Sequence, residues 1–385
     1  MRRVEKTLRQ QARDSVNGPL MLLVISLLAY GSVMVSSATA GMTGGPGLFR
    51  RHLVGIAIGL VPMVIAWAID YKKLKHWTGP LLILFAFLLI SPRIPGLGTT
   101  AKGATSWLQV FGVRLFQPSE PAKLVFIVVM AALIAEYEGR IDKPRDALRL
   151  LGYLGMAIAL ILLQPDLGTG LVFVAISFTM LLVGGMKGRY FAVLALVAVI
   201  GIAGILGIDA TLDRAFGRDV ALKDYQKNRL LVFVDPGRDP AGAGYNLAQS
   251  KIAIGSGGIS GSGLGSGTQS NLHFLPERHT DFIFAVLGEE LGFTGAILLL
   301  GLFLALLIAS LGIAASSRDL YGALVVAGVM GMWLFQILEN IGMTVGMMPI
   351  TGIPLPFMSF GSSAMVTNLG GVGLLLSVWS RRYGT

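Results

Sequence analysis

Residues 271–292 read NLHFLPERHTDFIFAVLGEELG, and this stretch determines how the rest of the chain is interpreted. Its charged part, Glu277 to Asp281, runs directly into an apolar segment, 282–287. Counted as a helix from Asp281, the stretch places small residues on the face of that carboxylate, namely Ala285, Gly288 and Gly292. Small residues let membrane helices pack closely, so the sequence predicts a carboxylate directed into a helix bundle. An ionisable group is costly there and marks a candidate functional site.

An alternative role for this carboxylate is purely structural. Thr280 and Asp281 are both favourable N-cap residues at a helix start, because their side-chain oxygens accept hydrogen bonds from backbone amides. The local sequence leaves the cap and the functional site open.

The composition is that of a membrane protein, with 54% hydrophobic and only 14% charged residues in 385. The chain has no cysteine, which excludes disulfides, thiol nucleophiles and thiolate metal sites. Its formal net charge is +10. In a membrane protein such an excess follows orientation and contact with anionic lipids. No zinc-finger spacing or basic region with interleaved aromatics is present, so we do not expect nucleic acid as a partner.

The chain is predicted to be an all-α polytopic membrane protein, a single domain over 1–385. An N-terminal tail, 1–18, precedes an uncleaved first span that begins at Pro19 and ends near Ala40. Nine further apolar segments give ten predicted membrane helices: 53–69, 78–91, 118–137, 150–165, 167–186, 189–208, 282–314, 320–346 and 357–379.

Loop charge predicts the orientation of these spans. The short loops assigned to the inside and the two termini together hold 17 Lys and Arg residues, whereas the short outer loops hold five. We therefore expect both termini in the cytoplasm and a long extracytoplasmic loop at about 209–280. Its glycine-rich part, 255–267, fits neither the dinucleotide nor the Walker pattern, and a flexible or closely packed turn region is the better interpretation.

Two predicted helix starts on the outer side carry acids. The segment 117–120 reads Gln-Pro-Ser-Glu, and the segment 164–166 reads Gln-Pro-Asp. Proline at the first position and an acid in the first turn are normal start signals, which accounts for Asp166. Lys123, in contrast, enters an apolar run. A buried lysine needs a counter-ion, and Glu120 one turn earlier can supply it.

Two further features lie in the last third of the chain. Glu339 and Asn340 sit late in the ninth span, and residues 346–363 read GMMPITGIPLPFMSFGSS. Such a proline-rich segment is tolerated at membrane depth where it lines protein or a water-filled cavity. We expect the outer acids, Lys123 and this segment to converge on one outward-facing cavity.

This set of residues suits a lipid-linked anion. Lys123, Arg114 and Arg278 could neutralise a pyrophosphate, and a carboxylate could remove a proton from an attacking hydroxyl. A divalent cation, Mg²⁺ or Mn²⁺, could assist the leaving group, which leaves the metal open. His279 lies beside Asp281, but no helical pair of histidines exists, so zinc is not expected.

The chain contains six long motifs: LPERHTDFIFAVLGEELG, QPSEPAKL, QPDLGTG, YQKNRLLVFVDP, GYNLAQSKIAIGSGG and TGIPLPFMSFGSS. Together they resemble the SEDS family (shape, elongation, division and sporulation), and the likeness runs from the first span to the last. The versions present here are more similar to the elongation members than to the division members.

The resemblance implies a peptidoglycan glycosyltransferase of the bacterial cytoplasmic membrane that polymerises lipid II on the outer face during cell elongation and rod-shape maintenance. It also implies a class B penicillin-binding protein as partner. Asp281 falls on the family's essential aspartate, Glu120 and Lys123 on its Glu-x-x-Lys pair, and Asp166 on its Gln-Pro-Asp acid. Further candidate supporting residues are Arg114, Arg278 and His279.

The implied reaction is an inverting transfer in which Asp281 acts as general base and undecaprenyl pyrophosphate leaves the growing glycan. The sequence departs from the family where two arginines usually precede Trp107, and at Phe360 and Ser362. The missing arginines place a phosphate role for that loop in doubt. A lipid II flippase is the alternative, and a scaffold for a partner enzyme is a third interpretation.

Overall fold

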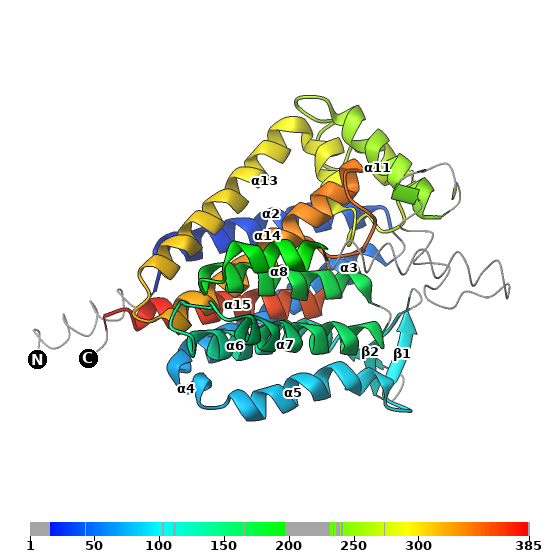
Figure 1. Ribbon diagram of the computed structural model, residues 1–385. Helices are drawn as coiled ribbons and strands as arrows, with labels where there is room; N and C mark the ends of the chain where they lie inside the picture. The colour runs from blue at the N-terminus through cyan, green and yellow to red at the C-terminus, as the bar shows by residue number, and fades with distance from the viewer. Residues whose placement is uncertain are drawn as a thin grey trace, which may run out of the picture.

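The computed structural model describes residues 16–42, 44–101, 104–110, 113–164, 166–196, 232–233, 235, 239, 242–272 and 274–383. These residues form a bundle of long helices with a small sheet at one end (Figure 1). The elements in chain order are α2 (Gly18–Ala40), α3 (Gly45–Ala68), α4 (Tyr71–Lys75), α5 (Thr78–Ile90), η1 (Ser91–Arg93), β1 (Gly98–Ala101), β2 (Ala104–Val110), β3 (Val113–Phe116), α6 (Ser119–Ala135), α7 (Pro144–Leu162), α8 (Leu167–Val183), α11 (Ala243–Gly257), α12 (Thr268–Asn271), α13 (Ile283–Ala315), α14 (Leu320–Val345) and α15 (Ser362–Ser380).

Most of the predicted spans correspond to helices. Within the described ranges, α2, α3, α13, α14 and α15 are long and apolar enough to cross a membrane, and residues 78–93 and α8 are shorter apolar helices. The predicted span 189–208 lies mostly outside the described residues. A multi-pass membrane protein is therefore supported, whereas the count of ten spans and the cytoplasmic termini stay predictions.

The centre of the bundle is formed by α14 and α15, which are the most buried of the long helices. Inside this core, the indole nitrogen of Trp333 on α14 donates to the amide oxygen of Asn368 on α15 at 2.9 Å. Pairing the two polar groups satisfies both of them where water is absent. A second packing centre joins α5, α6 and α8 through the rings of Phe85, Phe126 and Phe173.

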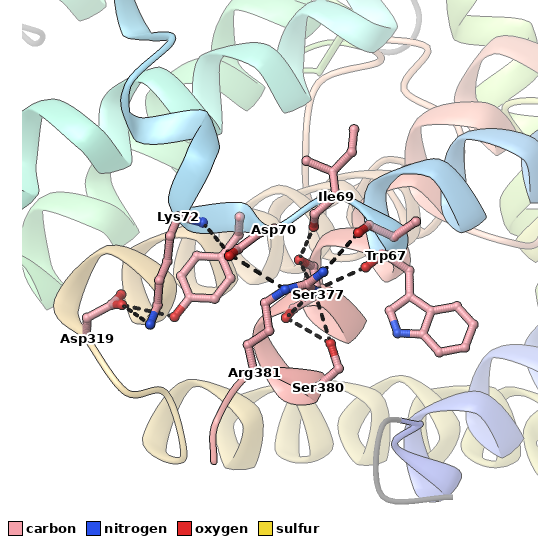
Figure 2. Close-up of polar contacts among 10 residues, drawn as sticks. Trp67, Ile69, Asp70, Lys72, Asp319, Ser377, Ser380 and Arg381 are labelled. Atoms are coloured by element: carbon pink, nitrogen blue, oxygen red, sulfur yellow. Dashed lines mark hydrogen bonds and ion pairs between the residues drawn. The ribbon is translucent and has the colours of Figure 1, made fainter. Parts of the chain in front are cut away.

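One end of the bundle is closed by polar contacts between α3, α4, α14 and α15 (Figure 2). Arg381 donates to the carbonyls of Trp67 at 3.2 Å and Ala68 at 2.9 Å, which are free because α3 ends there. It also pairs with Asp70 at 3.5 Å. Asp319 accepts from the Tyr71 hydroxyl at 3.0 Å, and burial raises the pKa of Tyr71, so the hydroxyl remains a donor.

The opposite end carries an element that the sequence analysis did not predict. Strands β1, β2 and β3 form an antiparallel sheet in that order, with Val110 opposite Val113 across the second hairpin (Figure 1). The prediction of an all-helical chain is therefore wrong at this point. The missed signal is the concentration of β-branched and aromatic residues in 104–116 with Gly112 between its two halves, which favours a hairpin.

The helix α13 is broken at Gly292, whose φ of 63° is one that residues other than glycine rarely adopt. The glycine-rich turn crosses the break: Ser262 and Gly263 donate to the carbonyls of Glu289 and Glu290, and Phe293 donates to Gly258. This part of 255–267 is therefore a closely packed turn, as expected.

Candidate active site

A small pocket of about 50 Å³ gathers the starts of α6 and α8 and the proline-rich segment after α14. Its lining consists of Gln117, Glu120, Lys123, Asp166, Thr169, Val172, Thr351, Gly352, Ile353 and Pro354. The expected convergence of Glu120, Lys123 and Asp166 with this segment is confirmed. Asp281 is not among the lining residues.

Glu120 and Lys123 form the predicted ion pair, with 2.8 Å between Oε1 and Nζ. Both side chains are buried, at 5% and 1% exposure. The Glu120 carboxylate therefore compensates the charge of the lysine inside its apolar helix. The second carboxylate oxygen of Glu120 is buried and has no hydrogen-bond partner within the described part of the chain. Because Glu120 lines the pocket, this oxygen is available to a donor on a bound ligand.

Asp166 has the structural role that the helix-start pattern predicted. Its Oδ1 accepts from the backbone amide of Thr169 at 3.0 Å and its Oδ2 from the Thr169 hydroxyl at 2.9 Å, which caps α8. The side-chain amide of Gln117 also donates through Nε2 to Oδ2 at 3.2 Å. Asp166 thus ties the start of α8 to the start of α6 and faces the pocket with both.

The pocket wall at residues 351–354 is held from two sides. A Cβ added at Gly168 would lie 3.2 Å from the Thr351 Cβ and 3.3 Å from Ile353, so the glycine lets this segment close onto α8. On the other side, the Thr351 hydroxyl donates to Glu339, and the Asn340 amide donates to the Ile353 carbonyl at 2.8 Å.

Asp281 lies directly before α13 and is half-buried. The helix begins at Ile283 with Phe282 at the N-cap position, so neither Asp281 nor Thr280 occupies the position of the cap. The backbone carbonyl of Asp281 accepts from the Asn340 amide at 2.9 Å. Since Asn340 also bonds Ile353, one side chain connects the Asp281 turn to the pocket wall.

The small residues after Asp281 pack closely, but the predicted continuous stripe on the face of Asp281 is wrong, because α13 begins after Asp281 and is broken at Gly292. Ala285 and Gly288 are buried, and a Cβ at Gly288 would lie 3.1 Å from Ile254 of α11. The partner of this face is therefore a helix within the long loop 209–280.

Arg278 is placed differently from the expectation that it neutralises a pyrophosphate. It is 2% exposed, does not line the pocket, and donates through Nε to the Ala38 carbonyl of α2 at 2.7 Å. Burial lowers the pKa of Arg278 from its ordinary value, and the nearby carboxylates of Glu290 and Glu289 act in the opposite direction. These contacts indicate a buried charge cluster that joins α2 to α13.

Two candidates remain: His279, beside the proline-rich segment, and Arg114, in the sheet. His279 is half-buried, with its ring centroid 5.4 Å from that of Phe360. Arg114 lies in β3, next to the strand that carries Trp107. The side chain of Arg114 lies outside the described part.

The described residues contain no group of three or more His, Asp or Glu side chains that could hold a metal ion. In the pocket, both oxygens of Asp166 already accept hydrogen bonds, and the ammonium of Lys123 lies 2.8 Å from Glu120. A divalent cation needs several oxygen ligands and would be repelled by the ammonium. The donor set therefore does not fit a resident divalent cation.

Comparison with known proteins gives consistent matches over nearly the whole chain. A family model described as "Cell cycle protein" and named for FtsW, RodA and SpoVE matches residues 19–383. The peptidoglycan glycosyltransferase MrdB of Escherichia coli K12 is 36% identical over 367 residues, covering 94% of this chain and 93% of MrdB.

Two solved structures share the fold. One, described as a peptidoglycan synthase complex that coordinates polymerization and crosslinking, superposes with a TM-score of 0.75 at 30% identity, covering 96% of this chain and 99% of the other. The rod shape determining protein RodA of Thermus thermophilus gives a TM-score of 0.67 at 27% identity, covering 96% and 98%.

Proposed function

Because the chain belongs to the FtsW, RodA and SpoVE family of cell cycle proteins, we infer that it is a peptidoglycan glycosyltransferase. We propose that it polymerises lipid II at the outer face of the cytoplasmic membrane during cell elongation. The observation that carries this proposal is the pocket in which a buried Glu120–Lys123 pair meets Asp166 beside the Asp281 turn.

The proposed reaction joins two lipid-linked sugars. The 4-hydroxyl oxygen of the N-acetylglucosamine in lipid II forms a bond to the anomeric carbon of the N-acetylmuramic acid that ends the growing strand. The bond from that carbon to undecaprenyl pyrophosphate breaks, and the hydroxyl proton moves to the Asp281 carboxylate. The stereochemistry at the anomeric carbon inverts.

The pocket residues support this transfer through their charges. Lys123 is the cation that lines the pocket in the described structure, and its ammonium can donate to the departing pyrophosphate while Glu120 compensates its burial. The unpartnered oxygen of Glu120 is an acceptor for a sugar hydroxyl.

A single substitution tests the proposed base. Asp281→Asn removes the proton acceptor and keeps the shape of the side chain, so purified protein should fold but form no glycan from labelled lipid II. Asp142→Asn, at an exposed carboxylate paired with Lys187, is the matched control and should polymerise normally. Near-normal polymerisation by Asp281→Asn would contradict the assignment.

We propose a class B penicillin-binding protein as the partner, because a structural neighbour comes from a complex that couples polymerization to crosslinking. Purified protein incubated with lipid II should give glycan polymer, and more of it with the cognate partner. Movement of lipid II across liposome membranes without polymer would instead favour the flippase. Depletion in cells should cause loss of rod shape, whereas filamentation would point to a division role.

A further inference from the structure

Three consecutive backbone carbonyls immediately before α13 accept hydrogen bonds from the last quarter of the chain. The pairs are His279 with the Phe360 amide at 2.9 Å, Thr280 with the Ser359 hydroxyl at 2.7 Å, and Asp281 with the Asn340 side-chain amide at 2.9 Å. We call these three bonds the carbonyl clamp. They fix the main chain of the candidate base at each residue of the turn.

The two side chains of the carbonyl clamp also hold the segment that forms the pocket wall. Asn340 is fully buried, and its Nδ2 donates both to Asp281 and to Ile353. Ser359 is 4% exposed; its hydroxyl donates to Thr280 while its oxygen accepts from the Leu355 amide at 2.9 Å. Each side chain therefore bridges the Asp281 turn and the segment 351–361.

The neighbouring residue on α14 extends the same arrangement. Glu339 accepts from the Thr351 hydroxyl, so adjacent residues of α14 hold Thr351 and Ile353, and both of these line the pocket. Two adjacent residues of α14 thus hold the pocket wall, and Asn340 also holds the backbone of the candidate base. Because buried polar groups in a membrane helix are costly, their presence here indicates a role beyond packing.

We propose that Asn340, together with Ser359, is a positioning residue that fixes the Asp281 main chain relative to the pocket wall at Ile353. The inference rests on the proposed function for its catalytic part. Misplacing a reacting group by about 1 Å costs up to about a hundredfold in rate, so the two bonds of Asn340 should affect turnover more than substrate affinity.

The test compares Asn340→Ala, Asn340→Asp and Ser359→Ala in the full-length protein with its partner. Asn340→Asp keeps the shape but loses both donors. The matched control is Asn368→Ala, another buried asparagine with one side-chain hydrogen bond, which lies in α15 and outside the carbonyl clamp. Three quantities are measured: lipid II turnover per folded molecule, the Kd for labelled lipid II, and amide hydrogen exchange in 280–286.

We expect both Asn340 variants to lower turnover about tenfold or more while the Kd changes less than about threefold. Exchange should rise at the turn amides of Thr280 and Phe282, which donate to Glu277, and at Ala285. Ser359→Ala should give a smaller loss of the same kind. Asn368→Ala should lower the melting temperature and leave turnover and exchange in 280–286 unchanged.

Unchanged exchange in 280–286 in the Asn340 variants would overturn the inference, whether or not the protein polymerises lipid II. Faster exchange with unaltered turnover would reduce Asn340 to a structural residue and also overturn it. Faster exchange in the variants of a protein that makes no polymer even as wild type would uphold the positioning of the Asp281 turn and refute the proposed function alone.

Discussion

The buried Glu120–Lys123 pair shows how one charge depends on another inside a membrane helix. Lys123 is 1% exposed and Glu120 5%, so neither charge is stabilised by water. Removing one partner leaves the other buried and uncompensated, which costs about 3–5 kcal/mol in comparable pairs. Each residue of the pair therefore needs the other to be tolerated in the fold, and the pair itself is retained for the proposed contact with the substrate.

We predict that Lys123→Met alone strongly lowers the melting temperature, and that the double substitution Glu120→Gln, Lys123→Met recovers most of this loss. Neither variant should polymerise lipid II, because the cation of the pocket is absent from both. Thermal unfolding in detergent and a polymerisation assay separate the two effects. An active double variant would show that polymerisation does not need the cation of Lys123.

Arg278 offers the opposite case, in which a residue predicted to contact substrate is held by the fold. Its contact with Ala38 and its nearness to Glu289 and Glu290 predict that Arg278→Ala lowers stability by about 3 kcal/mol or more, because two buried carboxylates lose a cation. Arg145→Ala, at an exposed position, is the control. A raised KM with an unchanged melting temperature would restore the substrate-binding role.

The sequence predicted the ion pair but not the contacts of Asn340, and the reason is physical. The ion pair of Glu120 and Lys123 spans one helical turn, so local spacing was sufficient. The contacts of Asn340 with Asp281 and Ile353 join residues 59 and 13 positions apart, and they depend on how separate segments fold together. No local pattern contains that information.

At the scale of elements, the helices were predictable and the short strands were not. Apolar runs such as the one in α14 have a single stable form in a bilayer, because a helix satisfies its own backbone. The sheet of β1 to β3 lies in a connection of the chain that needs no such run, and its strands have four, seven and four residues. The helix α11, inside a predicted loop, was missed for the same reason.

The close approach of α8 to the pocket wall gives a prediction at this scale. Gly168→Ala places a methyl group 3.2 Å from Thr351, so the segment 351–354 must shift by a few tenths of an ångström. We expect a folded protein with turnover reduced about tenfold. Gly152→Ala on α7 has nothing within 4 Å of the new methyl group and is the control. Equal turnover in the two variants would contradict the prediction.

At the scale of the whole molecule, the two ends of the bundle carry different tasks. The contacts of Arg381 with Asp70 and the end of α3, which we call the latch, close one end (Figure 2). The pocket lies at the starts of α6 and α8, and α6 directly follows the sheet at the other end (Figure 1). The distance between them makes stability and activity separable, because substitutions without shared partners act nearly independently.

We therefore predict that Arg381→Ala lowers the stability by about 1–2 kcal/mol through the loss of hydrogen bonds to the Trp67 and Ala68 carbonyls. Turnover per folded molecule should stay the same. Arg382→Ala, at the neighbouring position, tests whether the loss is specific to the latch. A fall in turnover without a fall in melting temperature would show that the two ends are coupled.

The carbonyl clamp holds only main-chain atoms of residues 279–281, so a substitution of the Asp281 side chain leaves its three bonds in place. An Asp281→Asn chain should consequently keep an intact binding surface while its chemistry is stopped. Such a dead-end form would let donor and acceptor lipids accumulate side by side, and it could be frozen for imaging as a trapped pre-reaction complex.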